Sequence, residues 1–139
     1  MRIIKFRGLT LATKEMIYGL VNKSNQPAEY DDIISNYRIA SNSENRFVIP
    51  ETIGQFIGLH DKNGKEIYEG DMLRDDYTDE DILIEDYSVV VWDKKFCQWA
   101  IDNSFAKDGS SFTNLVEYFG RETFEIVGNI FENADLVKL

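Results

Sequence analysis

The sequence predicts a mainly β fold, a β-rich α+β class with minor short helices. Apolar and polar residues alternate over much of the chain, which is typical of strands with one buried face. The chain has 139 residues, of which 43% are hydrophobic and 13% aromatic. A chain of this size and composition can bury one sizeable core and offset the entropy lost on ordering. We therefore expect one domain over residues 1–139.

The N-terminal third is expected to begin with a β-hairpin. Residues 2–7 and 15–21 alternate as two strands that are joined by a short turn-like segment. Residues 24–45 are polar and irregular, yet they hold four apolar residues at helix-compatible spacing, Tyr30, Ile33, Ile34 and Tyr37. We predict a connector with a short helix there, so that residues 1–45 form an N-terminal hairpin and a polar connector.

The clearest hairpin of the sequence follows Pro50 and turns at residues 61–65. A two-residue turn at Asn63 and Gly64 would set like charges opposite each other, which weakens a strand ladder. A three-residue loop with Gly64 in the left-handed region pairs Asp61 with Lys65 instead. We predict this register, which a negative φ at Gly64 would contradict.

A second hairpin is predicted from residue 87 to residue 101. Residues 87–92 and 96–101 alternate on either side of a charged turn. On the second of these strands Cys97 and Trp99 share one face at period two, so we expect Cys97 to lie in the core.

These strands are expected to form a small Src-homology-like β-barrel over residues 46–139, with a final strand at 123–131. The N-terminal hairpin would pack against the outside of this barrel.

Charge is distributed unevenly along the chain. There are 15 basic and 25 acidic residues, a net charge of -10. Eight acidic residues and one basic residue fall between Asp71 and Asp86, so this segment alone carries -7. We expect residues 75–81 to form a solvated loop. Contact with a phosphate backbone requires clustered Lys and Arg, so the composition argues against direct nucleic-acid binding.

The single cysteine excludes an intrachain disulfide and fits a reducing compartment. The sequence has no run of about 18 apolar residues and no basic segment followed by an apolar one at its start. We therefore expect a cytoplasmic protein without membrane association. Exposed strand edges would permit a homo-oligomer.

Three sequence blocks frame nearly the whole chain. They are KFRG at 5–8 with EMIYG at 15–19, IPETIGQFIGL at 49–59 continuing as DKNGKEIYEGD at 61–71, and IVGNIFEN at 126–133. In this order the blocks resemble the YopX family of phage and prophage proteins. Met16, where the family often has Trp, and Ala134, where Pro is usual, depart from the pattern. The resemblance implies a small phage or prophage protein that acts in the cytoplasm of a Gram-positive-type host, and it supplies no catalytic residues.

The sequence contains no motif that predicts catalysis or a cofactor. His60 and Cys97 are the only imidazole and thiol, and a nucleophilic cysteine needs an adjacent base and an electropositive setting, neither of which is indicated. Glu122 and Glu125 could act as acid and base, although nothing in the sequence fixes their separation. We expect no enzymatic activity, no catalytic residues and no cofactor.

Metal binding and base stacking are two further hypotheses. The segment from Asp61 to Gly64 resembles the start of a calcium loop, but the glycine falls at position 4 and position 12 is Met72. The acidic run at 75–81 could gather a hard cation, although such runs are usually hydrated loops, and we expect no metal site. Five aromatic residues could stack bases, but their strand-like spacing favours core positions: Tyr18, Phe56, Tyr68, Trp92 and Trp99.

The predicted function is that of a non-enzymatic protein–protein interaction module with an unidentified host or phage protein as its partner. The candidate interaction surface is acidic and comprises Asp75, Asp76, Asp79, Glu80 and Asp81. Neutralising these residues should leave the melting temperature nearly unchanged and weaken partner capture at low salt. One alternative is an acidic nucleic-acid mimic that inhibits a host DNA-binding protein. The other is a metal-dependent or other enzyme.

Overall fold

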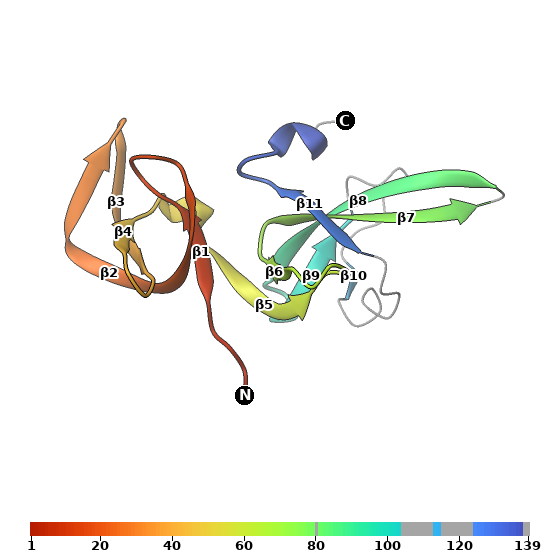
Figure 1. The fold of residues 1–139 in the computed structure, drawn as a ribbon, viewed down its shortest axis with the longest axis horizontal. Coiled ribbons are helices and arrows are strands. Elements are labelled where there is room, and N and C mark those ends of the chain that lie inside the picture. Colours follow the sequence, from red (N-terminus) through yellow and green to blue (C-terminus); the bar gives the residue numbers. More distant parts are fainter. Residues whose placement is uncertain (80, 104–112, 115–123, 138–139) are drawn as a thin grey trace. The chain divides into compact units, whose positions relative to one another are not determined.

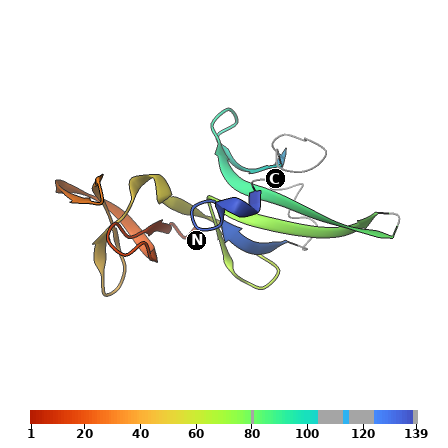
Figure 2. The same ribbon diagram turned by 90° about the horizontal axis from the view of Figure 1, so that it is seen from above.

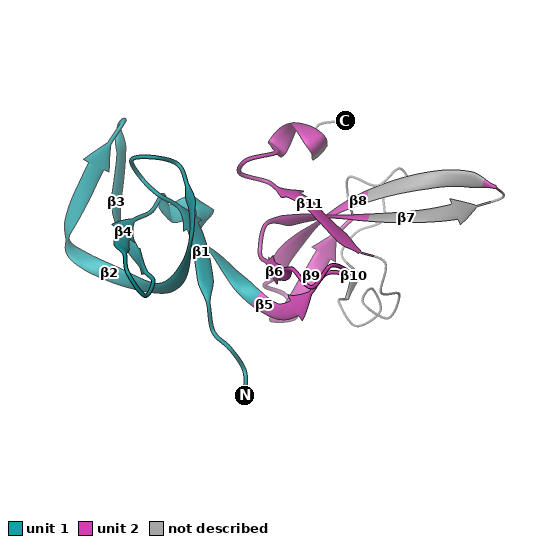
Figure 3. Cartoon of the chain, viewed as in Figure 1, with its two compact units in different colours: residues 1–56 teal, residues 57–139 magenta. Residues whose placement is uncertain are grey.

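The computed structural model describes residues 1–79, 81–103, 113–114 and 124–137, with the side chains at 75–79, 82–86, 113–114 and 137 left out of the description. The predicted mainly β class is confirmed, because strands dominate the described residues and the helices there are two short 3₁₀ segments. The chain divides into two compact units, residues 1–56 and 57–139 (Figure 3). The assignment of residues 1–139 to one domain stays a prediction.

The first unit is an antiparallel sheet (Figure 1). Its strands follow the order β4-β3-β2-β1-β5, and β5 continues into the second unit, where it pairs with β6. The elements are β1 (Phe6–Leu9), β2 (Met16–Tyr30), β3 (Ile33–Ala40), β4 (Asn45–Phe47), the 3₁₀ segment η1 (Pro50–Thr52) and β5 (Gly54–His60).

The predicted N-terminal hairpin is present, with Phe6 opposite Gly19 and Leu9 opposite Met16, but its first strand covers residues 6–9 and not the predicted 2–7. The second strand of this hairpin, β2, also lies very close to β3. A Cβ atom at Gly19 on β2 would lie 1.9 Å from the carbonyl oxygen of Ala40 on β3. Glycine at this position therefore permits the close approach of β2 to β3.

The predicted helix-containing connector at 24–45 is wrong, because these residues form most of a second hairpin, β2 with β3. Its two turn residues, Asp31 and Asp32, have φ angles of 48° and 63°. Two successive left-handed residues make the tight turn that matches the twist of paired strands, and aspartate tolerates this conformation. Tyr30 and Ile33 face each other across the turn, so their spacing of three reflects a chain reversal and no helical turn.

The predicted register of the turn at 61–65 is confirmed. Gly64 has a φ of 79°. The N–H of Asp61 donates to the Lys65 carbonyl at 2.9 Å, and the N–H of Gly64 donates to the Asp61 carbonyl at 3.0 Å. The opposite charges of Asp61 and Lys65 are thus paired at the base of the loop, as the sequence indicated.

The second unit contains an antiparallel sheet with the order β10-β9-β8-β7-β11. Its core cluster comprises Ile67, Leu73, Val90 and Ile101, against which Ile57, Trp99 and Ile126 pack. The elements are β6 (Glu66–Tyr68), β7 (Asp71–Asp79), β8 (Ile82–Asp93), β9 (Gln98–Asp102), β10 (Thr113–Asn114), β11 (Glu125–Asn129) and the 3₁₀ segment η2 (Ala134–Val137).

The Src-homology-like barrel is not confirmed. Within the described ranges the strands form two open antiparallel sheets, and the sheet of the second unit runs from β10 at one edge to β11 at the other.

Cys97 does not lie in the core, contrary to the sequence prediction. It is exposed and has a φ of 50° in the four-residue turn between Asp93 and Gln98. The turn extends further than its charged residues indicated, so β9 begins one residue after Cys97. Trp99 and Ile101 do share the core face of β9.

The acidic segment at 75–81 is not a loop, contrary to expectation. β7 continues to Asp79 and β8 begins at Ile82, so that the two strands run side by side as one long hairpin (Figures 1 and 2). The β-forming residues Tyr77 and Thr78 on one side and Ile82 to Ile84 on the other supply the strand propensity that the high charge obscured.

Candidate functional site

The predicted interaction residues lie at the end of the β7–β8 hairpin. Asp75, Asp76 and Asp79 belong to β7, and Asp81 occupies the turn with a φ of 67° and an exposed side chain. Glu80 lies outside the described residues. The structure therefore places Asp75, Asp76 and Asp79 on a strand ladder, where the backbone register fixes which residues stand opposite one another.

This register sets acidic residues against acidic residues at two successive positions. Asp75 is opposite Asp86, and Asp76 is opposite Glu85. Arg74, the one basic residue of the segment, is opposite Tyr87. Like charges directly opposite each other destabilise an antiparallel pair, by roughly 0.2–1 kcal/mol for each pair. The end of the hairpin thus breaks a rule of strand pairing twice in succession.

The charge of the chain is segregated between its two units. Residues 1–56 contain seven basic and six acidic residues, a net charge of +1. Residues 57–139 contain eight basic and nineteen acidic residues, a net charge of -11. The excess negative charge therefore lies in the second unit, and the β7–β8 hairpin carries most of it.

Asp61, the first residue of the calcium-loop-like segment, binds the chain's own backbone. Its Oδ1 accepts hydrogen bonds from the N–H groups of Asn63 and Lys65, each at 2.9 Å, and its Oδ2 accepts one from Ile126 at 3.1 Å. Burial of the carboxyl group raises its pKa. The three backbone hydrogen bonds and the charge of Lys65 lower the pKa by more than burial raises it, so that it lies below the ordinary value of 3.8. The carboxylate therefore has a structural role, which is to join the turn to β11.

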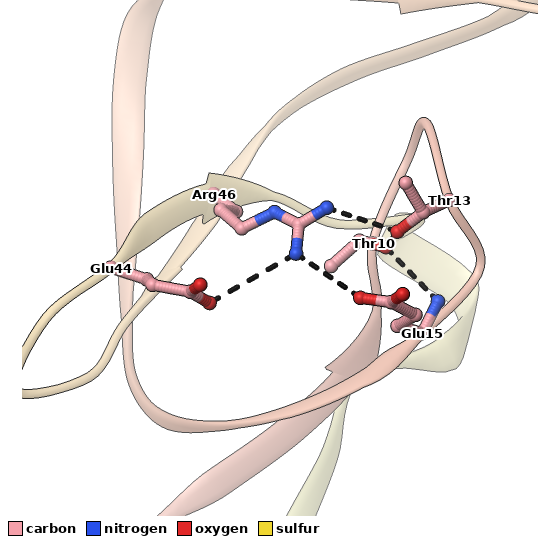
Figure 4. Close-up of polar contacts among 5 residues, drawn as sticks. All are labelled: Thr10, Thr13, Glu15, Glu44 and Arg46. Carbon is pink, nitrogen blue, oxygen red and sulfur yellow. Dashed lines mark hydrogen bonds and ion pairs between the residues drawn. The ribbon is translucent and has the colours of Figure 1, made fainter.

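A polar network surrounds Arg46 in the first unit (Figure 4). Its guanidinium donates to Thr13 Oγ1 at 2.9 Å and forms ion pairs with Glu15 at 3.4 Å and Glu44 at 3.9 Å. Thr10 Oγ1 contacts Thr13 Oγ1 at 2.7 Å and accepts the N–H of Glu15 at 3.0 Å. The network holds β4 to the turn between β1 and β2, and it gives Arg46 two carboxylate partners.

Comparison with known proteins identifies the family. A family model described as YopX protein matches residues 5–138, nearly the whole chain. The chain belongs to the YopX family. No curated protein matches it.

A solved structure supports the fold of this YopX-family chain. This chain is similar to the crystal structure of protein EF1440 from Enterococcus faecalis, with a TM-score of 0.55 and 23% sequence identity. The match covers 99% of this chain and 100% of that chain. At this identity the likeness shows the fold alone. None of the helices in the described ranges has the length and apolar character needed to span a membrane.

The residues considered for catalysis in this YopX-family chain do not come together in the part of the chain that the structure describes. His60 is exposed at the end of β5, and Cys97 is exposed in the turn before β9. Glu125 forms an ion pair with Lys62 at 3.5 Å, whereas Glu122 lies outside the described residues. Across the described part of the chain, no group of three or more His, Cys, Asp or Glu residues could hold a metal ion.

The five aromatic candidates divide between core and surface. Phe56 and Tyr68 are buried, and Trp99 packs against the core of the second unit. Tyr18 and Trp92 are exposed at 42% and 43%, contrary to the core prediction. Trp92 nevertheless contacts Trp99 edge to face, with 4.8 Å between the ring centroids.

The sequence also gave no indication that several large apolar residues of the β2–β3 hairpin would be exposed. They are Tyr18, Leu20, Tyr30, Ile34 and Tyr37. Tyr18 and Leu20 are two residues apart on β2 and therefore share one face of the strand. The polar composition of residues 24–45 could have indicated such a solvated hairpin, had its turn at Asp31 and Asp32 been recognised.

Proposed function

We propose that this YopX-family protein is a non-enzymatic interaction module that binds a basic protein partner through the acidic end of its β7–β8 hairpin. The observation that supports the proposal is the register, which opposes Asp75 to Asp86 and Asp76 to Glu85. A sequence that keeps two successive like-charge pairs gives up stability there. Local rules of folding are most often broken at positions that are kept for function.

The proposed partner is a host or phage protein that presents Lys or Arg, and the proposed setting is the host cytoplasm. Opposite charges on two surfaces raise the rate of encounter and suppress wrong partners. Because salt screens such attraction over about 10 Å at 0.1 M ionic strength, binding through the hairpin should weaken as salt increases.

The experiment compares two variants that change the charge by the same amount. Asp75→Asn with Asp76→Asn removes two charges from the hairpin. Asp31→Asn with Asp32→Asn removes two charges from the exposed β2–β3 turn, and asparagine tolerates the left-handed conformation there as aspartate does.

The immobilised full chain and both variants are exposed to lysate of the natural host at low and at high salt, and bound proteins are identified by mass spectrometry. We expect one protein to bind to the wild type and the turn variant at low salt, and to be lost from the hairpin variant. Equal retention by all three chains, or retention that is indifferent to salt, would contradict the proposal.

Nucleic-acid mimicry is a second candidate function, and the segregation of charge favours it. The net charge of -11 on residues 57–139 exceeds that of the whole chain. A mimic would compete with duplex DNA for the captured protein, because both would occupy the same basic surface. Competition by a short DNA duplex separates the two functions, since an interaction module with a partner of another kind would not be displaced.

A further inference from the structure

We infer that the first unit contains a binding pocket for a carboxylate attached to an apolar body, with Arg38 as the residue that binds the carboxylate. This pocket belongs to the first unit and the β7–β8 hairpin belongs to the second, and the inference does not rest on the proposed function. The pocket has a volume of about 410 Å³. Small-molecule sites in proteins typically fall in the range of about 300–1,000 Å³.

The pocket is lined from three segments of the first unit. The turn after β1 contributes Leu11, the β2–β3 hairpin contributes Glu29, Tyr30 and Arg38, and β4 contributes Arg46 and Phe47. Two aromatic rings and an aliphatic side chain thus stand beside two guanidinium groups. This combination suits a ligand with one charged end and one apolar end.

The two arginines differ in how their charges are compensated. Arg46 has a threonine hydroxyl and two carboxylates as partners. Arg38 makes no hydrogen bond or ion pair through its side chain within the described residues, and its Nε is buried there without an acceptor. An arginine stays protonated at any physiological pH, so this donor cannot be neutralised. No carboxylate of the described residues balances the charge of Arg38, and Arg38 is therefore the group in the pocket that calls for an anionic partner.

The position of Arg38 is fixed by stacking on its neighbour. Arg38 stands opposite Phe47 in the β3–β4 register, and its guanidinium carbon lies 4.2 Å from the centroid of the Phe47 ring. Stacking holds a guanidinium plane in place while its N–H groups remain able to donate in that plane. A carboxylate matches this planar fork with two parallel hydrogen bonds.

The charge of the remaining residues favours a single negative charge on the ligand. Glu29 lines the same pocket as Arg38. The ammonium of Lys14 lies 5.5 Å from the centroid of the Tyr30 ring. It also donates a hydrogen bond to the carbonyl oxygen of Leu11. Among the charged residues that line the pocket, one arginine without a carboxylate partner stands with one glutamate, which suits a monoanionic carboxylate better than a doubly charged phosphate. The rings of Tyr30 and Phe47 would then contact the apolar body of the ligand.

The test is an NMR titration of the full chain with three probes, benzoate, N-acetylphenylalanine and inorganic phosphate, read at the Nε–Hε signal of Arg38. Benzoate or N-acetylphenylalanine should shift that signal, and phosphate should not. Tighter binding of benzoate would identify a free aromatic acid as the ligand type, and tighter binding of N-acetylphenylalanine would identify a peptide C-terminus. Failure of both carboxylates to shift the signal, or a preference for phosphate, would overturn the inference.

Two variants of equal charge make the test specific. Arg38→Gln should weaken binding of the better carboxylate at least about tenfold, because it removes the charged fork. Arg2→Gln removes a charge from an exposed residue outside the pocket and should leave the affinity unchanged. Undiminished binding to Arg38→Gln, or an equal loss in both variants, would refute the role of Arg38. The wild-type titration decides the question if Arg38→Gln does not fold.

Discussion

Replacement of Asp61 tests whether a carboxylate joins the 61–65 turn to β11. In Asp61→Asn the amide oxygen can still accept the N–H groups of Asn63 and Lys65, but the amide nitrogen cannot accept the N–H of Ile126. A hydrogen bond to a charged group contributes about 1.5–3 kcal/mol, and its loss leaves a donor facing a donor. We therefore expect Asp61→Asn to lower the free energy of unfolding by about 1.5–3 kcal/mol at pH 7.

The dependence of this effect on pH follows from the lowered pKa of Asp61. A group whose pKa is lower in the folded state binds its proton more weakly there, so it stabilises the fold above its unfolded pKa. That stability is lost as the pH falls through the folded pKa. The difference between wild type and Asp61→Asn should therefore be constant from pH 7 to about pH 5 and shrink below about pH 4.

Urea unfolding at a series of pH values measures both effects. Asp93→Asn is a matched control, because Asp93 caps its turn through a single oxygen that accepts the N–H of Lys95 at 2.9 Å, and asparagine retains such an oxygen. We expect the control to change stability by less than about 0.5 kcal/mol. If Asp61→Asn is as stable as the wild type at pH 7, or if its deficit does not shrink at low pH, the structural role of the Asp61 carboxylate is refuted.

Two further predictions concern the strands. Asp75→Asn with Asp76→Asn should raise the free energy of unfolding by about 0.4–2 kcal/mol, because it relieves two like-charge pairs, and unchanged or lower stability in urea would contradict the register. In the loop that the sequence predicted for residues 75–81, neutralisation would leave the melting temperature nearly unchanged, and the strand register replaces that expectation. Gly19→Ala should destabilise the chain by about 3 kcal/mol or prevent folding, because its Cβ would meet the Ala40 carbonyl. The matched variant Gly58→Ala should lower the free energy of unfolding by only about 1–2 kcal/mol, because no atom lies within 4 Å of the added Cβ and only the φ of 89° is unfavourable for alanine. Urea unfolding of both variants measures the difference, and an equal loss in both would contradict the close approach of β2 to β3.

The sequence predicted local structure well where neighbouring residues decide it. The register at Gly64 followed from the charges of Asp61 and Lys65 and from the conformational freedom of glycine, all within five residues. The mainly β class followed from alternation, which is also a local property. Cys97 was misplaced because the turn extends to the residue before β9, so that Cys97 lies outside the strand whose alternation places Trp99 and Ile101 at the core.

The β2–β3 hairpin shows how spacing alone misleads. Tyr30, Ile33, Ile34 and Tyr37 have the separations of a helical face, yet a two-residue turn at Asp31 and Asp32 produces the same separations across a hairpin. The acidic segment was misread for a related reason, since its charge concealed the strand-forming residues on either side of Asp79.

The candidate sites depend on contacts that no local pattern reveals. The like-charge pairs arise from the register of β7 on β8, and the stack of Arg38 on Phe47 arises from the register of β3 on β4. Asp61 reaches Ile126 across 65 positions of sequence. Strand partners so distant in sequence are chosen by tertiary packing, so residue types could indicate the acidic surface but not the arrangement of its ladder.

The kinetics of partner binding test the proposed function most directly. The association rate constant of the captured partner is measured by surface plasmon resonance at several ionic strengths, for the wild type, Asp75→Asn with Asp76→Asn, and Asp31→Asn with Asp32→Asn. Electrostatic recognition acts mainly on association, so this rate constant should fall with salt and should fall in the hairpin variant but not in the turn variant. An association rate constant that is the same for all three chains at every ionic strength would contradict recognition through the acidic hairpin.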